Sequence, residues 1–284
     1  MKAQNYSYSN NGEFPVRFVK SSSVRTKSIL NLSQGFKTVG VSVATQRKIL
    51  KHCRVLALAS ERRTVRNSSG KYIDHQNTFI TLTLPSEQIH EDCEITKTVL
   101  GTFLDKSRKL GLLKNYVWRA EKQKNGNIHY HILTDTFANY SLFRRIWFLA
   151  LRKLGYLQAF SAKFSNMSFL EYSSQKFNQN RNPTEVAAAY GRGVQTRWQE
   201  PPACHVAFLS STDSVGKYVS KYVSKNNDDD KNIVTGRSWG ASSSVSLAVK
   251  TFCGNEEFSR HWYETGAFIM KSKVFATDFF SVCL

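Results

Sequence analysis

The chain has 284 residues, of which 41% are hydrophobic and 13% aromatic, so it can bury a core and is not a disordered polymer. Its 40 lysines and arginines outnumber its 21 acidic residues, and the formal net charge of +19 favours nucleic acid as the partner. No apolar run is long enough to cross a bilayer and the first residues lack the apolar part of a secretory signal, so we expect no membrane contact and a cytoplasmic protein.

The five cysteines are an odd number, lie far apart and never have the CxxC spacing of a metal or redox motif. We therefore expect reduced thiols that mostly fill space in the core, as in a cytosolic protein. The residues are Cys53, Cys93, Cys204, Cys253 and Cys283.

Residues 1–77 are expected to form a basic, partly helical extension that contacts DNA. Residues 1–40 are irregular, whereas the pattern of 45–59 predicts a helix with Thr45 as its N-cap. The apolar side of this helix comprises Ile49, Cys53 and Leu56. Its basic residues form either a solvated face or a contact to the DNA backbone, and they are Lys48, Lys51 and Arg54.

The first strong strand signal is residues 78–84, TFITLTL, in which threonine alternates with large apolar residues before Pro85. An amphipathic helix is expected over 94–110, with Gly111 at its C-terminal end. The apolar stripe of this helix comprises Ile95, Val99, Phe103 and Leu110.

A β-hairpin is predicted next, because the alternating segments 115–123 and 128–134 flank an Asn-Gly pair. A helix follows over 141–154 and ends at Gly155. The residues of this helix that share its apolar side are Phe143, Ile146, Trp147, Ala150 and Leu154.

The remaining chain has weaker signals. Residues 175–203 are polar and contain three prolines, so we expect much of this range to be loop. A last helix is predicted over 213–225, with Asp213 or Ser214 as N-cap.

Together the elements indicate an α+β fold in which helices flank a central antiparallel sheet. We place the core at residues 78–240, after the basic extension of residues 1–77. A C-terminal segment, residues 241–284, is expected to pack on this core.

His129 and His131 lie on the second strand of the predicted hairpin, where alternate residues share a face, so both imidazoles point the same way. Tyr130 and Ile132 then point to the opposite face. Two adjacent imidazoles can bind one divalent ion, although two histidines on a polar sheet face need not bind any.

The third ligand depends on the register of the hairpin. With a three-residue turn we expect Gln123 opposite the first histidine and Glu121 opposite the second; with a two-residue turn, Lys122 and Ala120 face the histidines.

The first register completes a His-His-carboxylate site with open positions, which suits Mg²⁺ or Mn²⁺ acting on phosphate. Glu121 is the expected third ligand and Gln123 its substitute. Glu121 could instead form an ion pair with Arg119 or Lys122.

Tyr218 and Tyr222 are four residues apart in the last predicted helix, so they present two phenols on one face. Lys221 and Lys225 border that face, where an ammonium group favours the phenolate. The pair can serve as nucleophiles, although tyrosines on such a helix also commonly pack in a core or an interface.

Four segments carry, in their order and spacing, a resemblance to a known family: FITLTLP (79–85), NYVWRAEKQKNGNIHYHILTD (115–135), YVSKYVSK (218–225) and GRSWG (236–240). They resemble the two-tyrosine replication initiators of the HUH endonuclease superfamily, and most of all the replication initiation proteins of the Microviridae, small phages with circular single-stranded DNA.

The resemblance implies a central antiparallel sheet that carries the HUH hairpin, with His129, His131 and Glu121 binding Mg²⁺ or Mn²⁺. It implies that Tyr218 and Tyr222 nick one strand at an origin, retain its 5′ end as a phosphotyrosine and later rejoin the strand into a circle. The products are a primed origin and a closed single strand, as in rolling-circle replication.

The expected partners are single-stranded or supercoiled origin DNA and a host helicase and DNA polymerase, in the cytoplasm of a bacterial host. The chain has no GxxxxGK[ST] motif, so we expect a partner to unwind the duplex. Lys217 and Arg237 are candidate DNA contacts, and the GRSWG segment also suggests a tight turn with a packed tryptophan.

Two other functions fit part of the pattern. A non-enzymatic binder of single-stranded nucleic acid would stack bases on the tyrosines and use the histidines structurally. Another HUH enzyme, such as a plasmid initiator, relaxase or transposase, would share the histidine motif. A relaxase usually has its tyrosines before the histidines, and a single-tyrosine transposase needs only one.

Overall fold

The computed structural model describes residues 42–66, 69–137, 140–211, 215 and 233–253. Contacts divide the chain into two units, Met1–Lys37 and Thr38–Leu284, and the described residues all belong to the second. Most of the helix predicted over 213–225 therefore lies outside the described residues. The predicted site residues that fall there are Lys217, Tyr218, Lys221, Tyr222 and Lys225.

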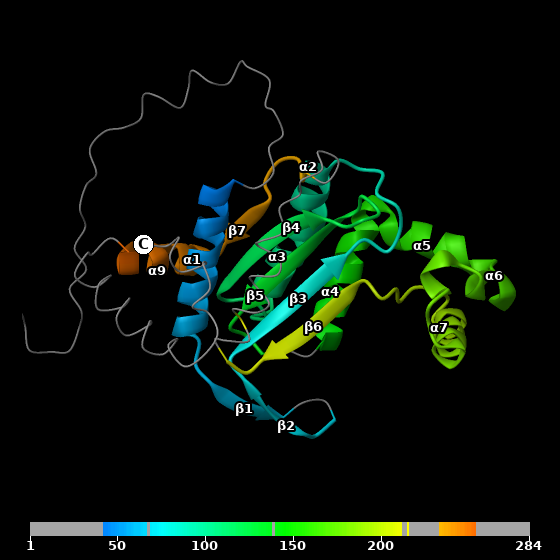
Figure 1. Cartoon of the computed structure of the whole chain (residues 1–284), viewed down its shortest axis with the longest axis horizontal. Helices are drawn as coiled ribbons and strands as arrows, with labels where there is room; N and C mark the ends of the chain where they lie inside the picture. Colours follow the sequence, from blue (N-terminus) through cyan, green and yellow to red (C-terminus); the bar gives the residue numbers. More distant parts are fainter. Residues whose placement is uncertain (1–41, 67–68, 138–139, 212–214, 216–232, 254–284) are drawn as a thin grey trace, which may run out of the picture. The chain divides into compact units, whose positions relative to one another are not determined.

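An antiparallel five-stranded sheet with the order β6-β3-β5-β4-β7 forms the centre of the described structure (Figure 1). Helices pack on both of its faces, which confirms the predicted α+β fold with a central antiparallel sheet. The strands are β3 (Asn77–Thr83), β4 (Tyr116–Lys122), β5 (Ile128–Thr134), β6 (Cys204–Leu209) and β7 (Trp239–Ala241).

The first face of the sheet carries the even-numbered residues of β3, β4 and β5, such as Ile80, Trp118 and Tyr130. They pack against the two helical regions expected over 94–110 and 141–154. The helical elements around this face are α2 (Asp92–Ile95), a π-helical turn η1 (Thr96–Leu100), α3 (Gly101–Lys109), α4 (Tyr140–Leu151), a 3₁₀ turn η2 (Arg152–Leu154) and α5 (Tyr156–Ser165).

The apolar stripe of the first of these helices is confirmed except at its end. Its earlier members are fully buried, but Leu110 is 64% exposed. The helix ends at Lys109 and the chain reverses through Gly111, whose φ is +70°. Leu113, beyond this reversal, is buried in the core instead.

The second face carries odd-numbered residues, including Phe79, Val117 and Leu133, and is covered by α1 (Val43–Ala59) and α9 (Ser243–Cys253). The apolar side predicted for the first helix is confirmed, since all three of its residues are buried. The N-cap is Ser42 rather than Thr45, because the Ser42 hydroxyl accepts a hydrogen bond from the Thr45 N–H at 3.2 Å.

The expectation of a loop over residues 175–203 is wrong for much of this range. It contains the 3₁₀ turn η3 (Lys176–Asn178) and α7 (Pro183–Gln195) and follows α6 (Phe169–Ser173). Pro183 begins α7, with Asn182 as N-cap, and proline is well tolerated in the first helical turn. A small aromatic core then forms around Trp198, comprising Phe160, Phe164, Tyr172, Val186 and Trp198.

Of the three cysteines whose side chains the structure describes, two follow the expectation that thiols fill the core. Cys53 and Cys204 are buried, and burial raises the pKa of each thiol to about 12, whereas Cys93 is exposed. In the part of the chain that the structure describes, no helix has the length and apolar character needed to cross a membrane.

A two-stranded ribbon joins α1 to β3. Its strands are β1 (Arg63–Arg66) and β2 (Tyr72–His75), and they pair antiparallel from Arg63 opposite His75 to Arg66 opposite Tyr72. His75, at its root, is fully buried and lies 2.9 Å from the Thr78 hydroxyl through Nε2.

The stability of the fold should depend on pH through His75. Burial, assisted by the charge of Arg63, lowers the pKa of His75 from 6.5 to about 4, while Asp135 opposes the shift. Between these values the unfolded chain binds a proton that the folded chain does not. The free energy of unfolding should therefore fall as the pH drops through this window, by at most about 1.4 kcal/mol per pH unit.

Urea denaturation at pH 7 and pH 5 measures this effect. We expect His75→Gln to reduce the difference in the free energy of unfolding between the two pH values. An unchanged difference in the variant would assign the acid sensitivity to other groups.

Candidate metal centre

The register of the β4–β5 hairpin determines on which side of the sheet each candidate ligand lies. Glu121 lies opposite His129, and Arg119 lies opposite His131. Neither register expected from the sequence occurs: the pairing that places Glu121 opposite His131 is wrong by two residues. Because a shift of two preserves the face, Glu121 still shares the side of the sheet with both histidines.

The turn of the hairpin explains the shift. The Gln123 N–H donates to the Asn127 carbonyl at 2.8 Å, the Gly126 N–H donates to the Gln123 carbonyl at 2.9 Å, and Gly126 has a φ of +85°. Gln123, the alternative ligand, thus closes the turn beyond the end of β4. Asn127 anchors the turn, since its amide donates to the Ser86 carbonyl and accepts from the Gln88 N–H.

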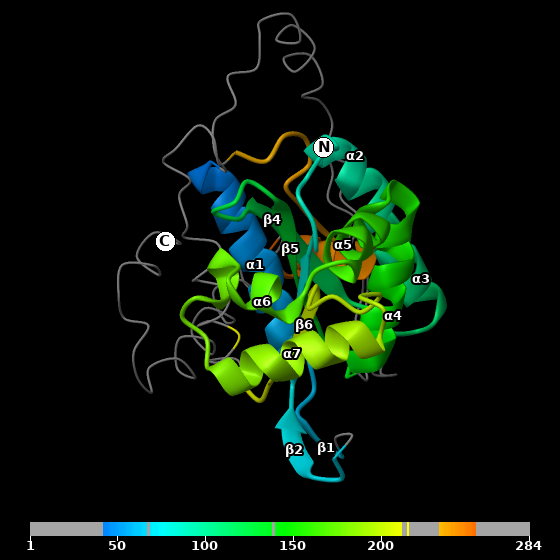
Figure 2. The ribbon, with the colours of Figure 1, turned by 90° about the vertical axis from the view of Figure 1, so that its right-hand side faces the viewer.

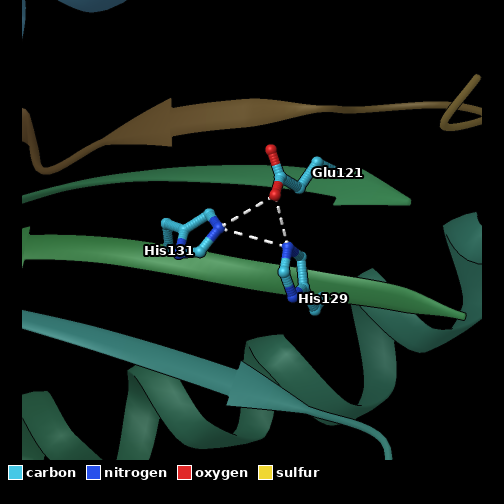
Figure 3. Close-up of side chains that lie close together, drawn as sticks. All are labelled: Glu121, His129 and His131. Atoms are coloured by element: carbon cyan, nitrogen blue, oxygen red, sulfur yellow. Dashed lines mark hydrogen bonds and ion pairs between the residues drawn. The ribbon is translucent and has the colours of Figure 1, made fainter. Parts of the chain in front are cut away.

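Three side chains converge at the turn end of this hairpin (Figure 3). The Glu121 Oε1 atom lies 2.6 Å from His129 Nε2 and 3.2 Å from His131 Nε2. The two Nε2 atoms are 3.1 Å apart. Glu121 and His131 are buried, and the side chain of His129, at 12% exposed, is the most accessible of the three.

These residues fit a divalent metal ion. Ligand atoms about 2.1 Å from an ion and at right angles to one another lie about 3 Å apart, which the three observed separations approach. Two imidazoles and one carboxylate leave coordination positions for substrate oxygens. The group can therefore hold a metal ion whose identity the ligand set leaves open.

Strand β3 supports the second histidine. Thr81 lies opposite His131, with its hydroxyl 3.2 Å from Nδ1, and the ring of Phe79 stacks on the imidazole at 5.4 Å. With Nδ1 engaged by Thr81, Nε2 is the atom directed to the centre, and such support commonly orients metal ligands. Thr81 has no sequence signal that marks this role, although strand alternation places it on this face.

The electrostatics of the group favour an ionised carboxylate. Burial by itself raises the pKa of Glu121, but hydrogen bonds to His129 and His131, together with the charges of these imidazoles, lower it by more, so the pKa lies well below its usual range. Arg119 is buried on the same face of the sheet. Burial lowers the pKa of Arg119, and the negative charge of Glu121 opposes this shift. The centre therefore combines a buried anion with a buried cation beside it.

Lys122 does not pair with Glu121, which corrects that alternative. Its ammonium group forms a buried ion pair with Asp92 at 2.6 Å, on the other side of the strand. The second Asp92 oxygen accepts a hydrogen bond from the Thr235 N–H at 3.0 Å. Asp92 therefore ties the strand of Glu121 to the residues that follow the predicted tyrosine helix, a link that sequence patterns did not indicate.

A scan against protein families matches residues 77–227, more than half of the chain, to the replication-associated protein ORF2 family. The chain belongs to this family. Membership supports a role in initiating rolling-circle replication. The matched range includes β3, the hairpin with its three converging side chains, and both predicted nucleophiles, Tyr218 and Tyr222. No curated protein and no solved structure gives a significant match.

The GRSWG segment of this replication-associated protein bends at Gly236 and then enters β7, and its tryptophan is packed as the sequence suggested. Gly236 has a φ of +83°, and Trp239 packs against His52 of α1 at 5.1 Å. Arg237 donates through Nε to the Trp239 carbonyl at 3.0 Å and lies 5.7 Å from the ring of Trp118. Its contact with DNA remains a prediction.

Proposed function

We propose that this replication-associated protein is a metal-dependent HUH endonuclease that nicks and rejoins origin DNA in rolling-circle replication, in the manner of Microviridae initiators. The convergence of Glu121, His129 and His131 on one face of an antiparallel sheet carries the proposal. The substrate is single-stranded or supercoiled origin DNA, and a host helicase and polymerase act with the protein in the bacterial cytoplasm.

The three ligands would hold Mg²⁺ or Mn²⁺, which when bound withdraws negative charge from a phosphate oxygen. A phenolic oxygen of Tyr218 or Tyr222 forms a bond to the phosphorus, and the bond from phosphorus to the 3′ oxygen breaks. The phenol loses its proton, with Lys221 and Lys225 favouring the phenolate. The leaving 3′ oxygen gains a proton and becomes the primer for the polymerase.

The second tyrosine completes the cycle. It attacks the regenerated origin, and the newly released 3′ hydroxyl attacks the first phosphotyrosine, so the strand closes into a circle and the first phenol is restored. One phosphodiester bond forms for each one that breaks, and the reaction therefore needs no ATP.

The ends of the tyrosine segment support its placement near the three ligands. The chain leaves β6 at Leu209, opposite Asn77, and Val215 is buried on the same sheet face as the ligands. The chain re-enters the sheet where the Ser238 carbonyl accepts from the Ala120 N–H, beside Glu121.

The described residues on either side of this segment therefore lie at opposite ends of the sheet, Leu209 at the Asn77 end and Ser238 at the ligand end. A helix rises about 1.5 Å per residue, so ten residues after Val215 cover about 15 Å. A helix over 213–225 that followed this direction would carry Tyr218 and Tyr222 toward the ligands.

Oligonucleotides that tile the genome encoding the protein provide the test. With labelled single strands and Mn²⁺, we expect one of them to form a covalent adduct that survives denaturing electrophoresis. The double variant Tyr218→Phe, Tyr222→Phe and the addition of EDTA should both abolish the adduct, while Tyr140→Phe, on α4, should retain it.

Two outcomes would contradict the proposal. An adduct with the double variant would exclude these tyrosines as nucleophiles. Binding of single strands by the wild type without any adduct, and without dependence on metal, would instead support a non-enzymatic binder.

A further inference from the structure

The β1–β2 ribbon extends away from the end of the central sheet, as Figures 1 and 2 both show. The described side chains along it are mostly exposed, and Tyr72 is 69% exposed. A two-stranded ribbon is marginally stable by itself. Its persistence as an exposed arm therefore depends on how its root is held.

The root of the ribbon is held by buried amide side chains. Gln76 donates through Nε2 to the carbonyls of Ala57 and Ser60, at 2.9 and 3.2 Å. Asn77 donates through Nδ2 to the Ser60 hydroxyl at 2.8 Å, and this hydroxyl donates to the Leu56 carbonyl. These contacts join the last turn of α1 to the start of β3, on either side of the ribbon.

A second set of contacts fixes the direction of the arm. The buried ring of His75 packs edge-on against Phe137 and Phe208, at 5.2 and 6.0 Å. Arg63 donates through Nη2 to the Asp135 carbonyl at 3.1 Å. Buried polar groups are costly unless they are hydrogen-bonded, and a bonded network makes a structure rigid. The root of the arm is thus held to α1 and to the sheet.

The projecting part carries a basic and aromatic surface. Arg66 and Lys71 are exposed near its turn and Arg62 and Arg63 near its root, while the exposed acidic residues of this region are Glu61 and Asp74. Arg66 lies opposite Tyr72, so the two side chains share one face. Arg66 also donates through Nε to the Gly70 carbonyl at 3.0 Å, which orients its guanidinium group along the turn.

We propose that this ribbon enters the major groove of duplex DNA. The major groove admits a two-stranded β-ribbon, and its walls are lined with phosphates that arginine can bind. Arginine also reads guanine edges, which gives an exposed arm a means of recognising sequence. The ribbon would therefore hold the double-stranded flank of the DNA rather than the strand that is cut.

The position of the contact relative to the nick rests on the proposed function. The arm begins at the Asn77 end of β3, whereas His129 lies opposite Thr83 at the other end. Six residues of strand span about 20 Å, which corresponds to roughly six base pairs. The arm should therefore contact the duplex from roughly six base pairs outward from the cleaved phosphate.

Duplex binding by the full chain tests the proposal. The variant Arg62→Gln, Arg66→Gln, Tyr72→Ser is compared with Lys106→Gln, Lys109→Gln, which removes two exposed charges from α3. Fluorescence anisotropy with a 5′-labelled duplex of random sequence gives Kd over a range of salt concentrations. We expect the ribbon variant to weaken duplex binding at least tenfold and to reduce the slope of log K against log salt by about 1.8.

The α3 control should change Kd less than threefold. Circular dichroism and thermal melting show whether each variant folds, and Arg62→Lys, Arg66→Lys, which keeps both charges, should retain most of the affinity for duplex. Equal weakening by the ribbon variant and the α3 control would overturn the proposal. A preferential loss of affinity for single strands would overturn it as well.

The same variants separate this inference from the proposed function. The ribbon variant should form the covalent adduct with a single-stranded oligonucleotide at the wild-type rate. If the wild type forms no adduct and the ribbon variant still loses duplex binding, the proposed nuclease function is refuted. The proposed contact between the ribbon and duplex DNA is then supported.

Discussion

Replacing Glu121 with glutamine should remove most of the Mn²⁺ affinity of this protein and slow strand cleavage by about 10³-fold, equivalent to roughly 4 kcal/mol of activation free energy. Glutamine keeps the size of the side chain but loses the negative charge that lies 2.6 and 3.2 Å from the two imidazoles. It also leaves the buried guanidinium of Arg119 without the opposing charge.

Titration calorimetry with Mn²⁺ and single-turnover cleavage of the adduct-forming oligonucleotide measure the two effects. Glu185→Gln, an exposed position in the first turn of α7, removes the same charge far from the ligands along the chain and should change neither. Normal Mn²⁺ affinity in Glu121→Gln would show that the three side chains are not a metal centre. Circular dichroism confirms that the variant is folded.

Replacing Asp92 with asparagine should lower the free energy of unfolding by about 3 kcal/mol, because it leaves a buried ammonium group without its partner. The Asp92 carboxylate binds Lys122 at 2.6 Å and accepts from Gln88 at 2.7 Å and Thr235 at 3.0 Å. Lys122 adjoins Glu121, and Thr235 follows the tyrosine segment. Cleavage at a temperature where the variant is folded should therefore fall by roughly tenfold or more.

Asp105 supplies the matched comparison. It forms an ion pair with Arg108 at 3.8 Å, but both side chains are more than half exposed. Asp105→Asn should change stability by less than about 0.5 kcal/mol, since surface ion pairs contribute little. Guanidinium denaturation of both variants measures the two changes in the free energy of unfolding. Equal changes would mean that burial does not determine how much the ion pair of Asp92 with Lys122 contributes to stability.

The candidate ligands show how far sequence periodicity reaches. Alternation along a strand places His129 and His131 on one face, and an Asn-Gly turn indicates the hairpin, so both follow from local physics. The partner of His129 depends on the number of residues in the turn and on the hydrogen bonds of Asn127, which donates to the Ser86 carbonyl and accepts from the Gln88 N–H. These residues are distant in sequence, and the register therefore differed from expectation by two.

The region after α5 shows the opposite case. Prolines and polar residues over 175–203 indicated a loop. However, Pro183 begins a helix and Trp198 packs in a small aromatic core. The side chain of Trp198 lies so close to Gly193 that an added Cβ would be 2.3 Å from its ring. Such packing depends on contacts between separate segments of the chain, and the composition of one segment does not indicate these contacts.

Periodicity and turn chemistry within about fifteen residues are enough to predict the antiparallel α+β class, the two sheet faces and the histidine pair. Local patterns do not indicate that Thr81 supports His131, that Asp92 joins Lys122 to Thr235, or that the buried amides of Gln76 and Asn77 hold the root of the basic ribbon. These contacts join residues far apart in the chain, and hydrogen bonds and ion pairs of this kind depend on positions that only the folded sheet provides.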